Sequence, residues 1–144
     1  MADRIVCGLL SFVSVAMLGA HALPRYAGTW EGMTNDLPSV ELVIQTSDDR
    51  ISGSIGFYFQ TRGADGKWHN GEKMSVPLLS PKLEGSVLTF ETIHHKKHGD
   101  PELGPNNKYR VDFIDDTEAR LKILGADQRQ ENDPDSGLKL THRK

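Results

Sequence analysis

Apolar and polar side chains alternate through most of the chain after residue 22, and this period of two residues predicts β-strands. The alternation is clearest in residues 50–61, where Ile51, Ile55 and Phe57 fall on one face. Further strands are expected at residues 26–33, 40–46, 86–95, 108–115, 118–124 and 138–142. No stretch from residue 23 onward has the apolar spacing of a stable helix, so the chain is predicted to be all-β.

Turn-forming residues separate these strands. Asn35-Asp36 and Asp48-Asp49 follow the first two strands, and residues 63–66 combine two glycines with an aspartate. Gly53 and Gly56 lie inside the longest strand and predict a bend or a bulge there. The less regular residues 67–81 fit either further strands or a lid.

The order of strands and short links favours an antiparallel up-and-down β-barrel of about eight strands, because closure removes exposed sheet edges. A β-sandwich is the alternative. Residues 96–107 and 126–136 are expected to be polar loops.

The first 22 residues have the character of a signal peptide. Arg4 precedes an uncharged apolar run at residues 5–18, which is shorter than the roughly 20 residues of a membrane-spanning helix. Ala20 and Ala22 supply the small side chains that signal peptidase recognises. We expect residues 1–22 to be a signal peptide, residues 23–144 to form a single domain, and the mature protein to be secreted or periplasmic without a membrane span. A buried N-terminal helix is the alternative.

Cysteine content and charge narrow the chemistry. Cys7 is the only cysteine and would leave with the leader, so no disulfide, thiol nucleophile or thiolate metal site is expected afterwards. The formal net charge of −3 and the scattered basic residues argue against nucleic-acid binding. The basic residues 94–98 are followed at once by Asp100 and Glu102, which is typical of a solvated loop.

Gly28-Thr29-Trp30, at the start of the first strand, resembles the Gly-x-Trp signature of lipocalins and the wider calycin group. The resemblance implies that the tryptophan plugs one end of a barrel and that a basic residue of the last strand lies across it. Arg143 is the candidate, although it falls on the face opposite His142, so a bulge would be needed. Nearly the whole of residues 23–144 is also similar to a group of uncharacterised secreted bacterial proteins.

An eight-stranded barrel has room for a filled core or for one small ligand. The side chains in the inward phase are Ile55, Phe57, Phe59, Leu88, Phe90, Tyr109, Val111, Phe113, Leu121 and Ile123. The candidate ligand-binding residues are Phe57, Phe59, Phe90, Thr92, His94, Tyr109 and Phe113. Thr92 and His94 would be polar groups near the rim of a pocket. Ordinary core packing is the alternative for each apolar position.

Metal-binding and catalytic signals are weak. His94 and His98 with a nearby carboxylate have suitable chemistry for zinc, but no HExxH motif is present. Residues 133–137 resemble half of a calcium loop without its closing glutamate. There is no nucleophile elbow and no phosphate-binding loop. No catalytic residue, metal or cofactor is therefore predicted.

Three classes of function remain. The favoured one is an exported carrier or sensor that binds an apolar or amphipathic small molecule. The alternative is a non-catalytic envelope module that binds another protein through Tyr58, Arg62, Trp68 and His69. An enzyme is the least favoured class, with His94 as its acid or base.

Overall fold

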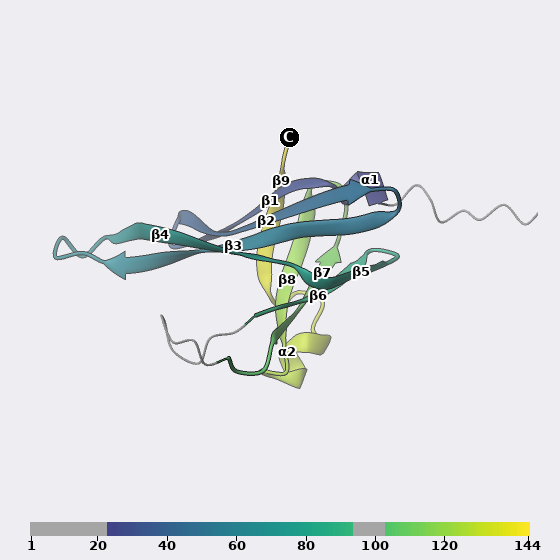
Figure 1. Cartoon of the computed structure of the whole chain (residues 1–144). Helices are drawn as coiled ribbons and strands as arrows, with labels where there is room; N and C mark the ends of the chain where they lie inside the picture. The colour runs from purple at the N-terminus through teal and green to yellow at the C-terminus, as the bar shows by residue number, and fades with distance from the viewer. Residues whose placement is uncertain (1–22, 94–102) are drawn as a thin grey trace, which may run out of the picture.

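The computed structural model describes residues 23–93 and 103–144, which form one β-sheet and two short helices (Figure 1). The elements in chain order are α1 (Leu23–Tyr26), β1 (Gly28–Thr34), β2 (Leu37–Ser47), β3 (Arg50–Arg62), β4 (Trp68–Pro77), β5 (Leu79–Glu84), β6 (Val87–Thr92), β7 (Asn107–Phe113), β8 (Glu118–Leu124), α2 (Gln128–Asn132) and β9 (Leu138–Arg143). The predicted leader, residues 1–22, lies outside the described residues.

The nine strands form a single antiparallel sheet in the order β4-β3-β2-β1-β9-β8-β7-β6-β5. Its two edges, β4 and β5, are consecutive in the chain and are joined by Leu78 alone. Leu78 is buried, and its N–H donates to the carbonyl oxygen of Gly53 at 3.0 Å. β4 and β5 do not pair with each other. The sheet curls through 233° and is an open half-barrel.

The prediction of an all-β, antiparallel up-and-down sheet is confirmed. The sheet has nine strands and an open side, where the sequence predicted about eight strands and a closed barrel. The additional strands, β4 and β5, cover residues 68–77 and 79–84, so residues 67–81 form strands and not a lid. All nine strands belong to one sheet, which excludes the sandwich alternative for the described residues.

Both predicted two-residue turns have left-handed backbone angles. Asn35 and Asp36 have φ values of 54° and 61°, and Asp48 and Asp49 have φ values of 47° and 63°. Paired left-handed residues match the twist of a hairpin, and asparagine and aspartate tolerate this conformation well. The sequence therefore specifies the β1–β2 and β2–β3 hairpins locally.

Of the bend or bulge expected at the glycines of β3, a bulge against β2 is absent. The β2–β3 register runs through Gly53 and Gly56 without a shift, whereas the β3–β4 register shifts between Tyr58 and Gln60. Gly53 has a φ of 155°, and a Cβ there would lie 1.9 Å from the carbonyl oxygen of Val43. This glycine is required for close backbone approach rather than for a bulge.

The β3–β4 hairpin extends well beyond the rest of the sheet (Figure 1). Only Val76 of β4 is even partly buried. An edge strand that extends beyond the sheet has solvent on both of its faces. Its sequence therefore lacks the alternation of apolar and polar side chains that a half-buried strand has. This explains why residues 67–81 looked irregular.

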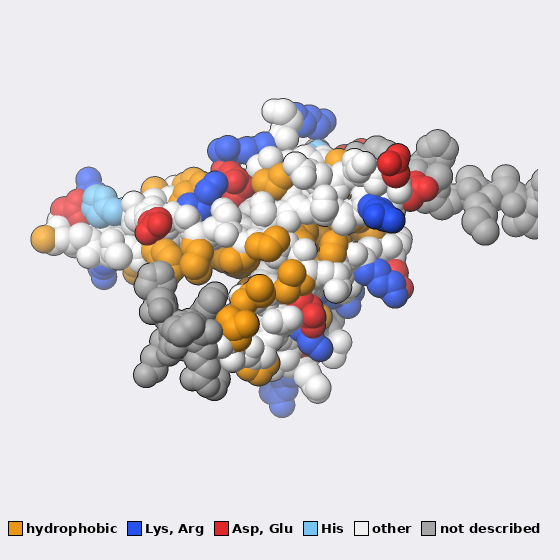
Figure 2. Space-filling view, in the orientation of Figure 1, with side chains coloured by type: hydrophobic (Ala, Val, Ile, Leu, Met, Phe, Trp, Pro, Cys, Tyr) orange, Lys and Arg blue, Asp and Glu red, His pale blue; other side chains and the backbone are white. Residues whose placement is uncertain are grey.

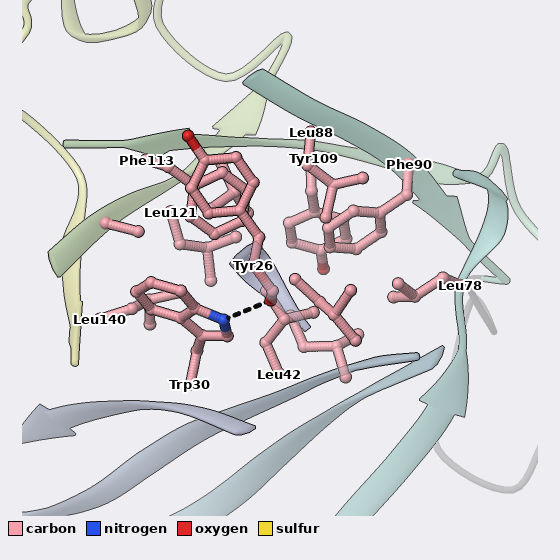
Figure 3. Close-up of a cluster of buried hydrophobic side chains, with 14 of the residues drawn as sticks. Tyr26, Trp30, Leu42, Leu78, Leu88, Phe90, Tyr109, Phe113, Leu121 and Leu140 are labelled. Carbon is pink, nitrogen blue, oxygen red and sulfur yellow. Dashed lines mark hydrogen bonds between the residues drawn. The ribbon is translucent and has the colours of Figure 1, made fainter. Parts of the chain in front are cut away.

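The interior of the half-barrel is filled by side chains from most of its strands (Figure 3). The largest fully buried apolar side chains are Trp30, Leu42, Ile55, Leu88, Phe90, Val111 and Leu140. They lie on the inward phase of their strands, which confirms the alternation read from the sequence. The middle of the sheet is thus a packed core and not a deep pocket.

Trp30 plugs one end of the half-barrel, and its stacking partner is His142. The two rings lie 4.4 Å apart at an angle of 4°, directly opposite one another in the β1–β9 register. The Trp30 indole N–H donates to the carbonyl oxygen of Tyr26 at 3.0 Å (Figure 3).

The assignment of Arg143 across Trp30 was wrong. Arg143 points away from the tryptophan and pairs with Glu31 at 2.8 Å. The last strand keeps its regular phase, so the residue on the inward face next to Trp30 is the preceding histidine.

Candidate ligand-binding cleft

A cleft of about 320 Å³ lies at the end of the half-barrel opposite Trp30. Its apolar floor consists of Val40, Phe57, Tyr109, Leu121 and Leu138, and the apolar side chain of Ile123 lies at its mouth. Its polar rim consists of Lys122, Asp127, Gln130, Glu131 and Ser136. Ala126 and Gly137 complete the lining. The cleft therefore joins the inner face of the sheet to the segment that carries α2.

The short length of β9 creates this space. β9 begins at Leu138, which pairs with Leu121, so its pairing with β8 in the described structure runs only from Leu121 to Glu118. The last three residues of β8 continue past that point and pair with β7 alone. Residues 126–137 run alongside this end of β8 and form the rim.

Aromatic rings form the deeper side of the floor. The Phe57 ring of β3 faces the Tyr109 ring of β7 across the interior, with centroids 6.1 Å apart. Tyr109 stacks on Phe90 at 5.2 Å behind it. Burial raises the pKa of Tyr109, and hydrogen bonds with Thr92 and Asn107 offset part of that rise. The Tyr109 hydroxyl stays protonated at neutral pH and anchors the ring.

Lys122 holds the rim in place. Its side chain is 5% exposed, and its ammonium donates to the carbonyl oxygens of Glu131 at 3.2 Å and Asp133 at 2.6 Å. The Asp112 carboxylate lies 3.6 Å away. Carbonyls at a helix C-terminus have no partner within the helix, so this lysine supplies the donors that end α2.

Asp127 begins α2. It occupies the N-cap position, and its carboxylate accepts a hydrogen bond from the Arg129 N–H at 2.9 Å. Gln130 follows three residues later, a spacing typical of a capping box. That local signal was available in the sequence, but the absence of large apolar side chains in residues 126–136 led to the prediction of a loop.

The structure places the seven candidate residues in different surroundings. Phe57 and Tyr109 line the cleft. Phe90 lies behind Tyr109, and Thr92 is buried next to the Tyr109 hydroxyl. His94 lies outside the described residues.

Phe113 and Phe59 lie away from the cleft. Phe113 stacks on Tyr26 at 4.0 Å at the Trp30 end. Phe59 follows the inward phase of β3, but it lies on the extended hairpin and is 48% exposed. Ile123 is also in the inward phase and is 56% exposed, because it stands at the mouth of the cleft.

A second hollow, of about 330 Å³, lies on the outer face of the sheet. Its lining includes Arg110, Asp112, Lys122 and Glu131. The Arg110 guanidinium donates to the Asp112 carboxylate at 2.7 Å, and Lys122 also faces Asp112. The charged groups of this hollow thus pair with one another. The first cleft is therefore the better candidate for a ligand site.

Comparisons with protein-family models, with curated proteins and with solved structures found no match for the chain. Among residues 23–93 and 103–144, no group of three or more histidine, cysteine, aspartate or glutamate side chains is arranged to hold a metal ion. The described helices include none long and apolar enough to cross a membrane.

Proposed function

We propose that this chain is an exported protein that binds an apolar or amphipathic small molecule in the cleft, as a carrier or a sensor. The observation that carries the proposal is the cleft itself, about 320 Å³ in volume with a floor of aliphatic and aromatic side chains. Ligand sites are typically concave and mostly apolar, with a few polar groups that fix orientation, and their volumes begin near 300 Å³.

Export is the part of the proposal that rests on the sequence. Residues 1–22 combine a charged start, an apolar run and small residues before position 23, as secretory signals do. Detection of a mature N-terminus at Leu23 in the periplasm or the medium would support it. Retention of residues 1–22 on the purified protein would count against it.

The lipocalin resemblance also supports a carrier. The described fold is an antiparallel half-barrel compatible with a calycin-like fold, and a basic side chain, His142, lies across Trp30 at its plugged end. The packed middle of the sheet favours a ligand held at the end opposite Trp30. The ligand would be compact and would not fill a deep calyx.

Native mass spectrometry of the purified protein is the first test, because a retained small molecule appears as added mass.

Titration with an apolar fluorescent dye then tests where the molecule binds. It compares the dye affinities of two variants, each with one of two isoleucines of nearly equal exposure replaced. Ile123→Asn removes an apolar contact at the mouth of the cleft and should weaken dye binding about tenfold. Ile114→Asn, on a side chain outside the cleft that is 59% exposed, is the control. Equal dye affinity in both variants would place the binding site elsewhere.

The β4 edge favours a second candidate function, the binding of an extended segment of another protein. β4 has no proline before its last residue, Pro77, whereas the opposite edge strand is interrupted by Pro81. Trp68, at the start of β4, is 43% exposed, and aromatic side chains are common at interface centres. A partner captured by the protein should lose affinity on Trp68→Ala. Unchanged affinity would argue against this surface.

A further inference from the structure

The rim of the cleft is rich in carboxylates, and their negative charge bears on which ligands the cleft can bind. The inference drawn from it rests on the proposed function. Residues 126–137 contain four carboxylates, Asp127, Glu131, Asp133 and Asp135, and one basic side chain, Arg129. Two of the carboxylates, Asp127 and Glu131, line the cleft directly above its apolar floor. They lie four positions apart, on the same side of α2.

Lys122, the basic residue in the lining, is not available to neutralise an anionic ligand. Its ammonium lies between the carbonyl oxygens of Glu131 and Asp133 and near the Asp112 carboxylate. Its side chain is almost fully buried. An anion would have to replace these contacts in order to pair with it.

Both rim carboxylates keep acceptor capacity. One oxygen of Asp127 accepts from the Arg129 N–H, and one oxygen of Glu131 accepts from the Gly125 N–H. The second oxygen of each carboxylate has no hydrogen-bond partner among the described residues. A carboxylate can accept several hydrogen bonds, so each can also bind a ligand donor.

We propose that the cleft takes an amphipathic molecule with a cationic head group, an amine or an ammonium. Its apolar body would lie on Phe57, Tyr109, Leu121 and Leu138, and its head would lie between Asp127 and Glu131. Opposite charges attract across a partly exposed site, and an anionic head such as a carboxylate would be repelled by the same two groups. Figure 2 shows apolar side chains gathered below the β3–β4 hairpin, on one face of the molecule.

The test compares three probes with the same ten-carbon chain and different heads. Decyltrimethylammonium, decyl glucoside and decanoate are titrated into the full chain below their micelle concentrations, at low and at high salt. We expect the cation to bind at least tenfold more tightly than the anion, with the neutral probe between them. The difference should shrink at high salt, because exposed charges are screened.

Two double variants assign the preference to the rim. Asp127→Asn with Glu131→Gln removes both charges while keeping an N-cap oxygen and an acceptor for the Gly125 N–H. Asp36→Asn with Asp135→Asn removes the same charge away from the cleft lining and is the matched control. The first double variant should lose the cation preference, and the control should retain it.

Each outcome bears on one claim. Equal affinity for all three heads, or a preference that survives in the rim variant, would overturn the cationic head group and leave the apolar site standing. Binding of none of the three probes would overturn the proposed function itself.

Discussion

At the scale of single residues, His142 connects three parts of the chain. Its Nε2 lies 3.0 Å from the carbonyl oxygen of Ala27, and its Nδ1 lies 2.9 Å from that of Asp116. A Cβ on Gly28 would lie 2.6 Å from Nε2, so only glycine allows this approach. The ring thereby ties β9 to the start of β1 and to the β7–β8 turn, while it covers Trp30.

Replacing His142 with phenylalanine keeps the stacked ring and removes both polar contacts. We expect His142→Phe to lower the free energy of unfolding by about 1–3 kcal/mol, because the polar contacts of the ring with the carbonyl oxygens of Ala27 and Asp116 are lost and the first of these contacts is part-buried. Arg143→Ala, which breaks only an ion pair with an exposed arginine, should cost less than about 1 kcal/mol. Urea unfolding measures both. A larger cost for Arg143→Ala would mean that the basic residue important to this end is Arg143 after all.

The sequence shows which residues face inward more reliably than which of them meet a ligand. Phe57, Tyr109 and Phe113 are all in the inward phase, as predicted. Yet Phe113 fills the plugged end, while Phe57 and Tyr109 reach the cleft. Whether an inward side chain reaches the cleft depends on its position along its strand. The place of the cleft depends in turn on where β9 begins, and the alternation of side chains does not show this.

At the scale of elements, neither short helix, α1 nor α2, was predicted from the sequence, and α2 is the one that borders the cleft. Residues 126–136 have no large apolar side chain, so this helix is not held by a hydrophobic face. It is held by Lys122, whose outward phase on β8 predicts an exposed side chain. The burial of Lys122 follows from the return of residues 131–133 over it, a tertiary contact that strand periodicity cannot predict.

Lys122→Met tests this explanation of α2. The methionine would fill a similar volume but would leave the carbonyl oxygens of Glu131 and Asp133 without their donor. We expect a loss of about 2–4 kcal/mol of stability and faster amide hydrogen exchange across residues 126–137. Lys108→Met is the control, since its ammonium is exposed and lies 3.8 Å from Glu91. Similar small effects of both substitutions would show that α2 does not depend on Lys122.

The β7–β8 turn should contribute stability that depends on pH. The hydroxyl and N–H of Thr117 and the N–H of Glu118 donate to Asp115 and lower the pKa of its carboxyl below the usual value of an aspartate. Because the pKa of Asp115 is lower in the folded than in the unfolded state, its carboxylate stabilises the fold at pH values above the unfolded-state pKa. This stabilisation is lost as the pH falls through the folded-state pKa. Asp115→Ala should therefore destabilise the protein at neutral pH, and the difference from the native chain should diminish in acid. A difference that stays constant from pH 7 to pH 2 would contradict this.

At the scale of the whole molecule, the two ends of the half-barrel differ. One end is plugged by Trp30, His142, Tyr26 and Phe113, whereas the other opens into the cleft beneath α2. The alternation of side chains predicted the all-β class and most of the inward residues, whereas the place of Trp30 at one end was implied by the calycin resemblance. The open side was not predicted, because the alternation of side chains does not show that β4 and β5, which only Leu78 separates in the chain, fail to pair.

The most direct test of the account is an NMR titration of the isotope-labelled chain with decyltrimethylammonium. Saturable shifts confined to the lining of the cleft, at Phe57, Tyr109, Ile123 and the amides of residues 126–137, are the predicted result. Shifts centred on Trp68 and the β4 edge would contradict a small-molecule site in this cleft, and so would the absence of saturable shifts with this probe, with decyl glucoside and with decanoate.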